Sequence, residues 1–228
     1  MRWVAVDSMS VARQRKRITK DIASNYPAFE GLRDTLLERR AVNLTAVHLQ
    51  LLNSIGEMGL AQHSGGKWYV GDNAGRRYLT GGWLEEYVAL AIEEIGADEV
   101  FIGQKISWRV GEFVGENEID VLARFGDRLF LCSCKALKSV LLPDDARTRE
   151  RLMDALHEAD NLADHFAPSG GVVALTVTTD LVDERLRSAR YQQLHGKAAV
   201  LGVGLITLEH MPWAALTRRL NALLVGDL

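Results

Sequence analysis

The sequence predicts an α/β protein whose core runs helix, three strands, helix, strand, behind a small and mostly helical N-terminal module. Apolar residues recur at helical spacing over 81–95 and stop at Gly96, as in an amphipathic helix. Three strand-like segments follow with no helix between them, at 99–110, 115–125 and 128–135. A long charged helix over 145–166 then leads into the apolar strand 172–179.

The composition is that of an ordinary globular protein. The 228 residues are 47% hydrophobic and 25% charged, and no apolar run approaches the roughly 20 residues of a membrane helix. The first residues lack the apolar stretch and cleavage site of a secretory signal, so we expect a cytoplasmic protein with no membrane contact. The only cysteines, Cys132 and Cys134, occupy alternate strand positions, so we expect reduced, buried thiols.

Residues 1–80 are expected to form the N-terminal module. Apolar residues repeat at helical spacing between Asn43, a plausible N-cap, and Gly59, a plausible stop. Turn residues around the short run Trp68–Val70 then indicate a hairpin, and helices followed by such a ribbon suggest a winged-helix-like module. The first 40 residues hold nine Lys or Arg against five Asp or Glu. That excess fits either a phosphate contact or a solvated helix face.

The second domain, 81–228, contains the α/β core and extends beyond it. We expect a helix over 181–196, a strand over 197–208 and a closing helix over 213–224.

The strongest chemical signal is the stretch Asn117–Lys135, "NEIDVLARFGDRLFLCSCK". Strand side chains alternate between faces, so Glu118 and Asp120 share a face, as do Ser133 and Lys135. If Gly126 and Asp127 form a two-residue turn, Asp120 lies opposite Ser133 and Glu118 lies opposite Lys135. The hairpin then gathers two carboxylates and an ammonium group in one small volume.

This arrangement suits phosphodiester hydrolysis with a hard divalent ion. Mg²⁺ prefers oxygen ligands, usually one or two carboxylates completed by water and substrate phosphate. Asp120 and Glu118 would supply carboxylates, and the backbone carbonyl of Cys134 a further oxygen. Lys135 would orient the attacking hydroxide or offset the charge that develops on the phosphate. The alternative is an ordinary surface pair between a Glu and a Lys. The position of these residues in an α-β-β-β-α-β order favours the restriction-endonuclease-like fold and the catalytic interpretation.

The chain resembles a known family in four motifs. These are "GGWLEEYV" at 81–88, "NEIDVL" at 117–122, "LFLCSCK" at 129–135 and "GGVVALTV" at 170–177. In order and spacing they resemble the nuclease module of the CRISPR ancillary nucleases activated by cyclic oligoadenylate, members of the PD-(D/E)XK superfamily.

The resemblance implies a metal-dependent nuclease of antiviral defence that cuts DNA, RNA or both with Mg²⁺ or Mn²⁺. It implies a homodimer or a component of a larger defence complex. By position, Asp120 is the aspartate of the motif, Lys135 its lysine and Glu118 the flanking acid, while Glu85 corresponds to the first-helix acid that often joins the metal site.

Two departures from the family pattern matter. The acid expected two residues before the lysine is Ser133, and a hydroxyl is a poorer Mg²⁺ ligand than a carboxylate. Either Glu118 and Glu85 compensate, or the protein is a degenerate subunit that binds nucleic acid or assembles with partners. In addition, 80 residues are too few for the Rossmann-like sensor domain of the family, so we expect no cyclic-nucleotide sensing by that route. A truncated chain, a stand-alone nuclease and a component of a larger complex all remain open.

Overall fold

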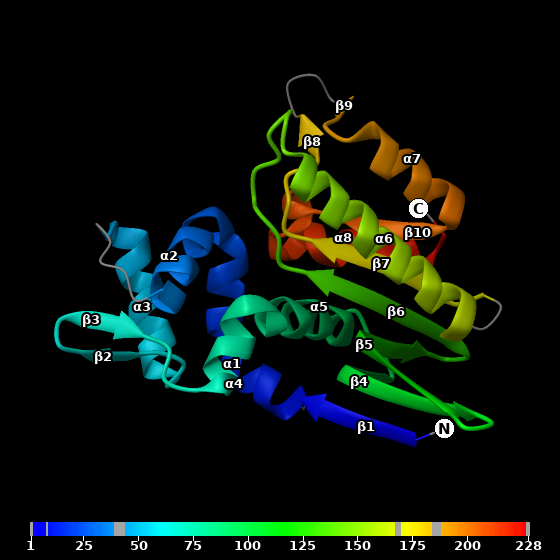
Figure 1. Cartoon of the computed structure of the whole chain (residues 1–228), viewed down its shortest axis with the longest axis horizontal. Helices are drawn as coiled ribbons and strands as arrows, with labels where there is room; N and C mark the ends of the chain where they lie inside the picture. The colour runs from blue at the N-terminus through cyan, green and yellow to red at the C-terminus, as the bar shows by residue number, and fades with distance from the viewer. Residues whose placement is uncertain (1, 8, 39–43, 167–169, 184–187, 227–228) are drawn as a thin grey trace.

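The computed structural model describes residues 2–7, 9–38, 44–166, 170–183 and 188–226 (Figure 1). Its centre is a mixed six-stranded sheet in the order β1-β4-β5-β6-β7-β10. The strands are β1 (Arg2–Asp7), β4 (Glu99–Val110), β5 (Phe113–Phe125), β6 (Arg128–Lys135), β7 (Val172–Val177) and β10 (Val203–Ile206). Strands β1, β4, β5 and β6 pair antiparallel, whereas β7 pairs parallel with both β6 and β10.

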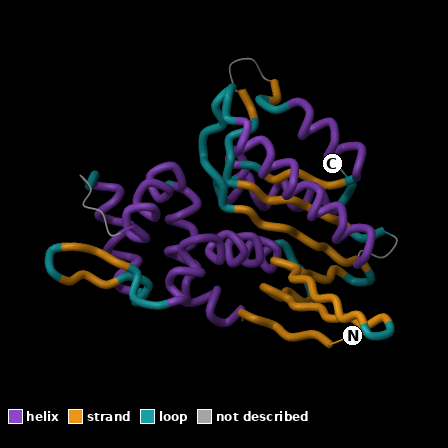
Figure 2. Tube along the Cα trace, viewed as in Figure 1, coloured by secondary structure: helices purple, strands orange, loops and turns teal. Residues whose placement is uncertain are grey.

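Helices cover both faces of this sheet (Figure 2). The helices are α1 (Met9–Ser24), α2 (Tyr26–Glu38), α3 (Ala46–Glu57), α4 (Asn73–Arg77), α5 (Trp83–Glu94), α6 (Ala146–Phe166), α7 (Gln192–Leu201) and α8 (Trp213–Leu224). A π-helical turn η1 (Tyr78–Gly82) joins α4 to α5, and a 3-10 turn η2 (Leu208–His210) precedes α8. Buried residues of α1, α5 and α8 form one core with one face of the sheet, and those of α6 and α7 form a second core with the other.

The N-terminal part combines three helices with a hairpin, as predicted. The hairpin consists of β2 (Gln62–Ser64) and β3 (Lys67–Tyr69), and Figure 1 shows it at the end of the molecule far from α7. Thr45 is the N-cap of α3, and the expected cap Asn43 lies outside the described residues. The domain boundary at residue 80 stays a prediction. Elements before it contact elements after it, since β1 pairs with β4 of the central sheet and α1 packs against α5.

The order of core elements expected from the sequence is confirmed, but the helix expected over 181–196 is wrong. The described part of that segment holds a small hairpin, β8 (Val182–Asp183) and β9 (Ser188–Ala189), and α7 begins only at Gln192. Glu209 accepts hydrogen bonds from the backbone N–H groups of Leu181 and Val182 at 2.7 and 2.6 Å. These bonds satisfy donors that a helix would leave open at its first turn, so the extended conformation is stabilised.

The strand expected over 197–208 is also shorter than predicted. Residues up to Leu201 belong to α7, and only Val203–Ile206 form β10. Gly202, with φ at +68°, ends the helix in the left-handed conformation that glycine adopts without strain. The closing helix agrees with the prediction, and no helix in the described ranges is long and apolar enough to cross a membrane.

Candidate active site

The hairpin β5–β6 has the register that the two-residue turn predicts. Val121 lies opposite Cys132, and the ladder continues in step to Phe125 and Arg128 at the turn. Beyond Val121 the backbone pairing stops, and the side chain of Asp120 takes its place. The backbone N–H of Cys134 donates to Asp120 Oδ2 at 2.6 Å. The expected pair of Asp120 with Ser133 is therefore not part of the ladder, although the Asp120 side chain does contact the end of β6.

A kink in the neighbouring strand places Asp120 at this point. The register between β4 and β5 is the same on both sides of Asp120, yet its partner Gly103 drops out of the ladder and has φ at +60°. Val121 packs into the core under α5, whereas Ile119, two residues earlier, packs into the core under α6. Regular alternation would put both on one face, so the chain changes faces at Asp120.

The predicted hairpin residues meet at one cavity of about 450 Å³ between β5, β6 and α6. Its lining is Asn117, Glu118, Asp120, Ser133, Lys135, Glu158, Asn161 and Leu162. Asp120 and Lys135 thus face the same space, as the catalytic interpretation requires. Three carboxylates against one ammonium group leave the cavity with an excess of negative charge.

Burial raises the pKa of Asp120 above its ordinary value, because desolvation disfavours the carboxylate. The bond from Cys134 and the charge of Lys135 act in the opposite direction without cancelling this effect. Only Oδ2 of Asp120 has hydrogen-bond donors among the described residues, since Ser133 Oγ also points at that oxygen, at 3.4 Å. A half-buried carboxylate that lines a polar cavity, with donors on only one of its oxygens in the described part of the chain, is suited to bind a cation.

Lys135 does not pair with Glu118, which corrects the expected opposition of these two residues. Its ammonium lies 2.7 Å from Glu158 of α6 instead. Burial alone would lower the pKa of Lys135, but the contact with Glu158 and the charge of Asp120 raise it overall. Lys135 is therefore a protonated group throughout the neutral range.

Glu118 and Glu85, the other two predicted acids, share a cation that the sequence did not indicate. Arg77 Nη2 lies 3.4 Å from Glu85 Oε2 and 3.6 Å from Glu118 Oε1. Glu85 occupies the first turn of α5 and Glu118 lies on β5, so Arg77 joins the helix to the strand. Glu85 does not line the 450 Å³ cavity, although its charge acts on Cys134.

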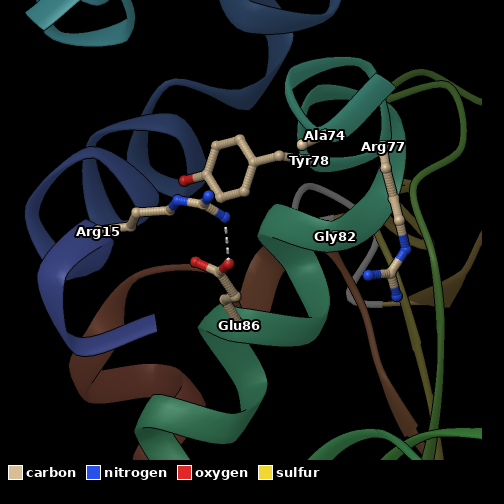
Figure 3. Close-up of a pocket in the computed structure, with 6 residues that line it drawn as sticks. All are labelled: Arg15, Ala74, Arg77, Tyr78, Gly82 and Glu86. Atoms are coloured by element: carbon tan, nitrogen blue, oxygen red, sulfur yellow. Dashed lines mark hydrogen bonds and ion pairs between the residues drawn. The ribbon is translucent and has the colours of Figure 1, made fainter. Parts of the chain in front are cut away.

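The opposite side of the same helical segment forms a second, smaller pocket of about 110 Å³ (Figure 3). There Arg15 of α1 pairs with Glu86 at 2.8 Å, and the guanidinium lies 4.9 Å from the ring centre of Tyr78. Figure 3 shows Arg77 pointing away from this pair. The adjacent residues Glu85 and Glu86 thus serve two different sites.

Several cations of the basic N-terminal segment form contacts with other parts of the chain. Three of its cations bind acids of α5, in the pairs Arg13–Glu93, Arg15–Glu86 and Lys16–Glu94. Lys20 lies 3.5 Å from the ring centre of Trp213. These contacts favour a structural role for α1 over a phosphate contact.

Ser133 and Cys134, at the end of β6, point to different sides: Ser133 lines the cavity, whereas the Cys134 side chain lies in the core. Ser133 is 3% exposed, and the one contact of its hydroxyl within the described ranges is the long one with Asp120. Cys132 and Cys134 are free and buried, as predicted, so no thiol faces the cavity. The N–H and C=O of a residue in an extended strand point to the same neighbour. The carbonyl of Cys134 therefore faces β5 and Asp120, as the predicted carbonyl ligand requires.

These residues fit a hard divalent ion held by few protein ligands. Among the described residues no group of three or more His, Cys, Asp or Glu side chains is arranged to hold a metal. Mg²⁺ commonly takes one or two carboxylates and completes its shell with water and phosphate. Asp120, Glu118 and the Cys134 carbonyl offer such an incomplete, oxygen-only set.

Sequence reasoning missed Glu158 and Arg77. Glu158 and Asn161 are polar residues three apart on α6, so they share one face of that helix, but nothing in the sequence places the face over β6. Arg77 contacts Glu85 because the π-helical turn between them, η1, brings the two side chains to the same side of the helix. Neither position belongs to a motif quoted above.

The sheet order, the two helical layers and the acids and lysine at one cavity define an α/β protein of the restriction-endonuclease-like class. Two solved structures share this fold. Protein VC1899 from Vibrio cholerae matches with a TM-score of 0.68 and 18% identity, over 97% of this chain and 59% of that chain. Can2 from Sulfobacillus thermosulfidooxidans, solved in complex with cyclic tetra-adenylate, matches with a TM-score of 0.60 and 13% identity, over 97% and 58%.

A comparison of the sequence with models of protein families identifies the family of this chain. A family model described as the Card1-like endonuclease domain matches residues 72–195, which is more than half of the chain. The chain belongs to this family, and the resemblance that its motifs indicated is confirmed. No curated protein matches the sequence. The chain spans somewhat less than three fifths of the two solved structures.

Proposed function

We propose that this protein is a divalent-metal-dependent nuclease that hydrolyses phosphodiester bonds of DNA, RNA or both. The observation that carries the proposal is the convergence of Asp120, Glu118 and Lys135 on one cavity, at the strand ends where the family motif predicts the active site. Membership of the Card1-like endonuclease family supports the reaction class.

Mg²⁺ or Mn²⁺ would be held by Asp120 and Glu118 with the carbonyl of Cys134, and Glu85 would join once Arg77 releases it. The bound ion would neutralise charge on the scissile phosphate and make a water molecule more acidic. Each of these ligands is an oxygen, in agreement with the preference of both ions.

The chain itself contributes orientation and charge. The N–H of Cys134 fixes Asp120 Oδ2 and so directs the other carboxylate oxygen. The ammonium of Lys135, in the same cavity, compensates the negative charge that develops on the phosphate as the water attacks. The protonated state of Lys135 matches this electrostatic role.

The biological setting that we propose is antiviral defence of the CRISPR type, in a cytoplasmic homodimer or a larger complex. Can2 supports this setting by its shared fold and by its complex with cyclic tetra-adenylate. We propose that the nuclease activity described here responds to a signal of that kind through parts of the assembly other than the Asp120 cavity.

One observation favours a second candidate, a degenerate subunit that binds nucleic acid without cutting it. Ser133 is buried where the family motif has an acid, and it brings no charge to the cavity. We favour the enzyme, because Asp120, Glu118 and Lys135 are all directed into the cavity.

A cleavage assay separates the two candidates. Supercoiled plasmid, single-stranded DNA and RNA are incubated with the protein and Mg²⁺, Mn²⁺ or EDTA. The enzyme predicts cleavage that requires metal and is lost in Asp120→Ala and reduced in Lys135→Ala. Asp127→Ala is the matched control, since it removes an exposed carboxylate at the tip of the same hairpin. Binding without cleavage by the wild type, under every condition, supports the degenerate subunit.

Ser133→Glu tests whether the missing acid limits the reaction. The variant restores the family pattern beside Asp120, so we expect equal or faster cleavage and tighter Mn²⁺ binding. A complete loss of cleavage in a folded variant contradicts the proposed ligand geometry.

A further inference from the structure

Lys135 contacts Glu158, a residue outside the four motifs that this chain shares with the family. Lys135 Nζ and Glu158 Oε2 are 2.7 Å apart across the cavity that Asp120 also lines. Within the described residues Lys135 forms this ion pair and none with Asp120, although the charge of Asp120 acts on it. The ammonium is therefore held near Asp120 but out of direct contact.

We propose that Glu158 is the positioning residue of Lys135. Resting on the proposed nuclease function, this assignment gives Glu158 two tasks. It aims the ammonium across the cavity, and it keeps the ammonium away from Asp120, whose second oxygen then stays accessible to a divalent cation.

The helix that carries Glu158 is a rigid support. Its buried side packs into the core under the sheet, through residues that include Leu156 and Ala159 on either side of Glu158. Asn161, one turn further on, lines the same cavity. The polar face of α6 thus forms the wall of the cavity that faces β6.

The ion pair of Lys135 and Glu158 contributes little to folding stability. The side chains of Lys135 and Glu158 are 36% and 59% exposed, and ion pairs that exposed contribute little. A purely structural role therefore predicts that replacing Glu158 has no measurable consequence. A positioning role predicts a loss at the site without a loss of stability, so the two are separable.

The physical consequence of losing Glu158 follows from the remaining charges. In Glu158→Gln the ammonium of Lys135 loses its ion-pair partner, and the carboxyl group of Asp120 lines the same cavity. A lysine side chain is long and flexible, so the ammonium moves toward Asp120 and competes with a cation for it. Removing Lys135 as well removes the competitor.

The experiment is a double-mutant cycle read by Mn²⁺ binding and by cleavage. Wild type, Glu158→Gln, Lys135→Ala and the double variant are titrated with Mn²⁺ by calorimetry, after thermal melts have verified folding. We expect Glu158→Gln to weaken Mn²⁺ binding about tenfold, as losses of groups that orient metal ligands commonly do. In the Lys135→Ala background the same change is expected to cost nothing. In single-turnover cleavage of plasmid, Glu158→Gln is expected to slow the reaction in the wild-type background and to have no further effect in the Lys135→Ala background.

Glu150→Gln is the matched control, because it makes the same chemical change at an exposed position of the same helix, away from the cavity lining. It should bind Mn²⁺ and cleave like the wild type.

The outcomes are distinguishable. Wild-type Mn²⁺ affinity in Glu158→Gln overturns the proposal, as does an equal loss in both backgrounds, which would make Glu158 a direct ligand. If the Mn²⁺ cycle holds but the wild type cleaves no nucleic acid, the nuclease function fails and the positioning role stands. If the wild type binds no Mn²⁺, both fail.

Discussion

Replacing Glu86 by Gln tests how firmly the N-terminal helix holds the helix that carries the site. Glu86 of α5 pairs with Arg15 of α1 at 2.8 Å, and the two side chains are 3% and 21% exposed. Gln removes the negative charge but keeps the shape, so the guanidinium of Arg15 stays largely buried without its counter-ion. Removing one partner of a fully buried pair costs roughly 3–5 kcal/mol. Because Arg15 keeps some contact with water, we expect about 2–3 kcal/mol here.

Denaturant unfolding measures this free energy, and a thermal melt gives an independent reading. For a chain of this length, about 1 kcal/mol corresponds to a shift of roughly 2–4 °C, so the melting temperature should fall by about 4–12 °C. Glu93→Gln is the matched control, because Glu93 lies on the same helix and pairs with Arg13 of α1, but those side chains are 35% and 58% exposed. Its melting temperature should not change measurably. Equal shifts in the two variants would refute the argument from burial.

Three further predictions concern the site and the core. Asp120→Asn should abolish cleavage but stabilise the metal-free protein at neutral pH, because burial raises the pKa of Asp120 and its ionisation therefore costs folding free energy. Unfolding curves at several pH values should show this gain disappearing below the ordinary aspartate pKa of 3.8, where both proteins are uncharged at this position. Arg77→Gln should bind Mn²⁺ more tightly than the wild type in calorimetry, because it removes the cation that Glu85 and Glu118 share. An unchanged Mn²⁺ affinity would contradict the idea that Arg77 competes with the metal for these carboxylates. Gly204→Ala should lower the unfolding free energy by roughly 1–3 kcal/mol, because the new methyl group would lie 2.4 Å from a methyl carbon of the buried Leu223. Denaturant unfolding with no loss would show that Leu223 repacks without cost.

The hairpin at the centre of the site was predictable because its determinants are local. The turn residues Gly126 and Asp127 fix the register by their position alone, and the register fixes which residues lie opposite Asp120. Gly126 has φ at +59°, as a tight turn of this kind requires. Once the register is set, the shared cavity of Asp120 and Lys135 follows from strand geometry.

The partners of these residues were not predictable, because they come from distant segments. Glu118 and Lys135 were expected to face each other, but the chain changes faces beside Gly103, and α6 brings Glu158 to Lys135. Whether a helix of polar character presents a given residue to a sheet depends on how the helix packs, which periodicity does not determine. The helix wrongly expected near Val182 fails for the same reason, since Glu209 lies far along the sequence from the backbone that it binds.

The π-helical turn explains how one short segment contacts both Glu118 at the active-site cavity and Arg15 of α1. Arg77 and Glu85 are eight residues apart, as are Tyr78 and Glu86, and eight residues of regular α-helix rotate about 80° past two full turns. A π-helical turn rotates less per residue, so η1 brings both pairs back into alignment. Arg77 then contacts Glu85 on the side of the active-site strands, and Tyr78 and Glu86 meet Arg15 on the side of α1. Glu86 therefore binds α1, and its neighbour Glu85 on the same helix binds the cation that Glu118 also contacts. Ion pairs of two adjacent residues of α5 thus connect the N-terminal helix to the proposed metal site.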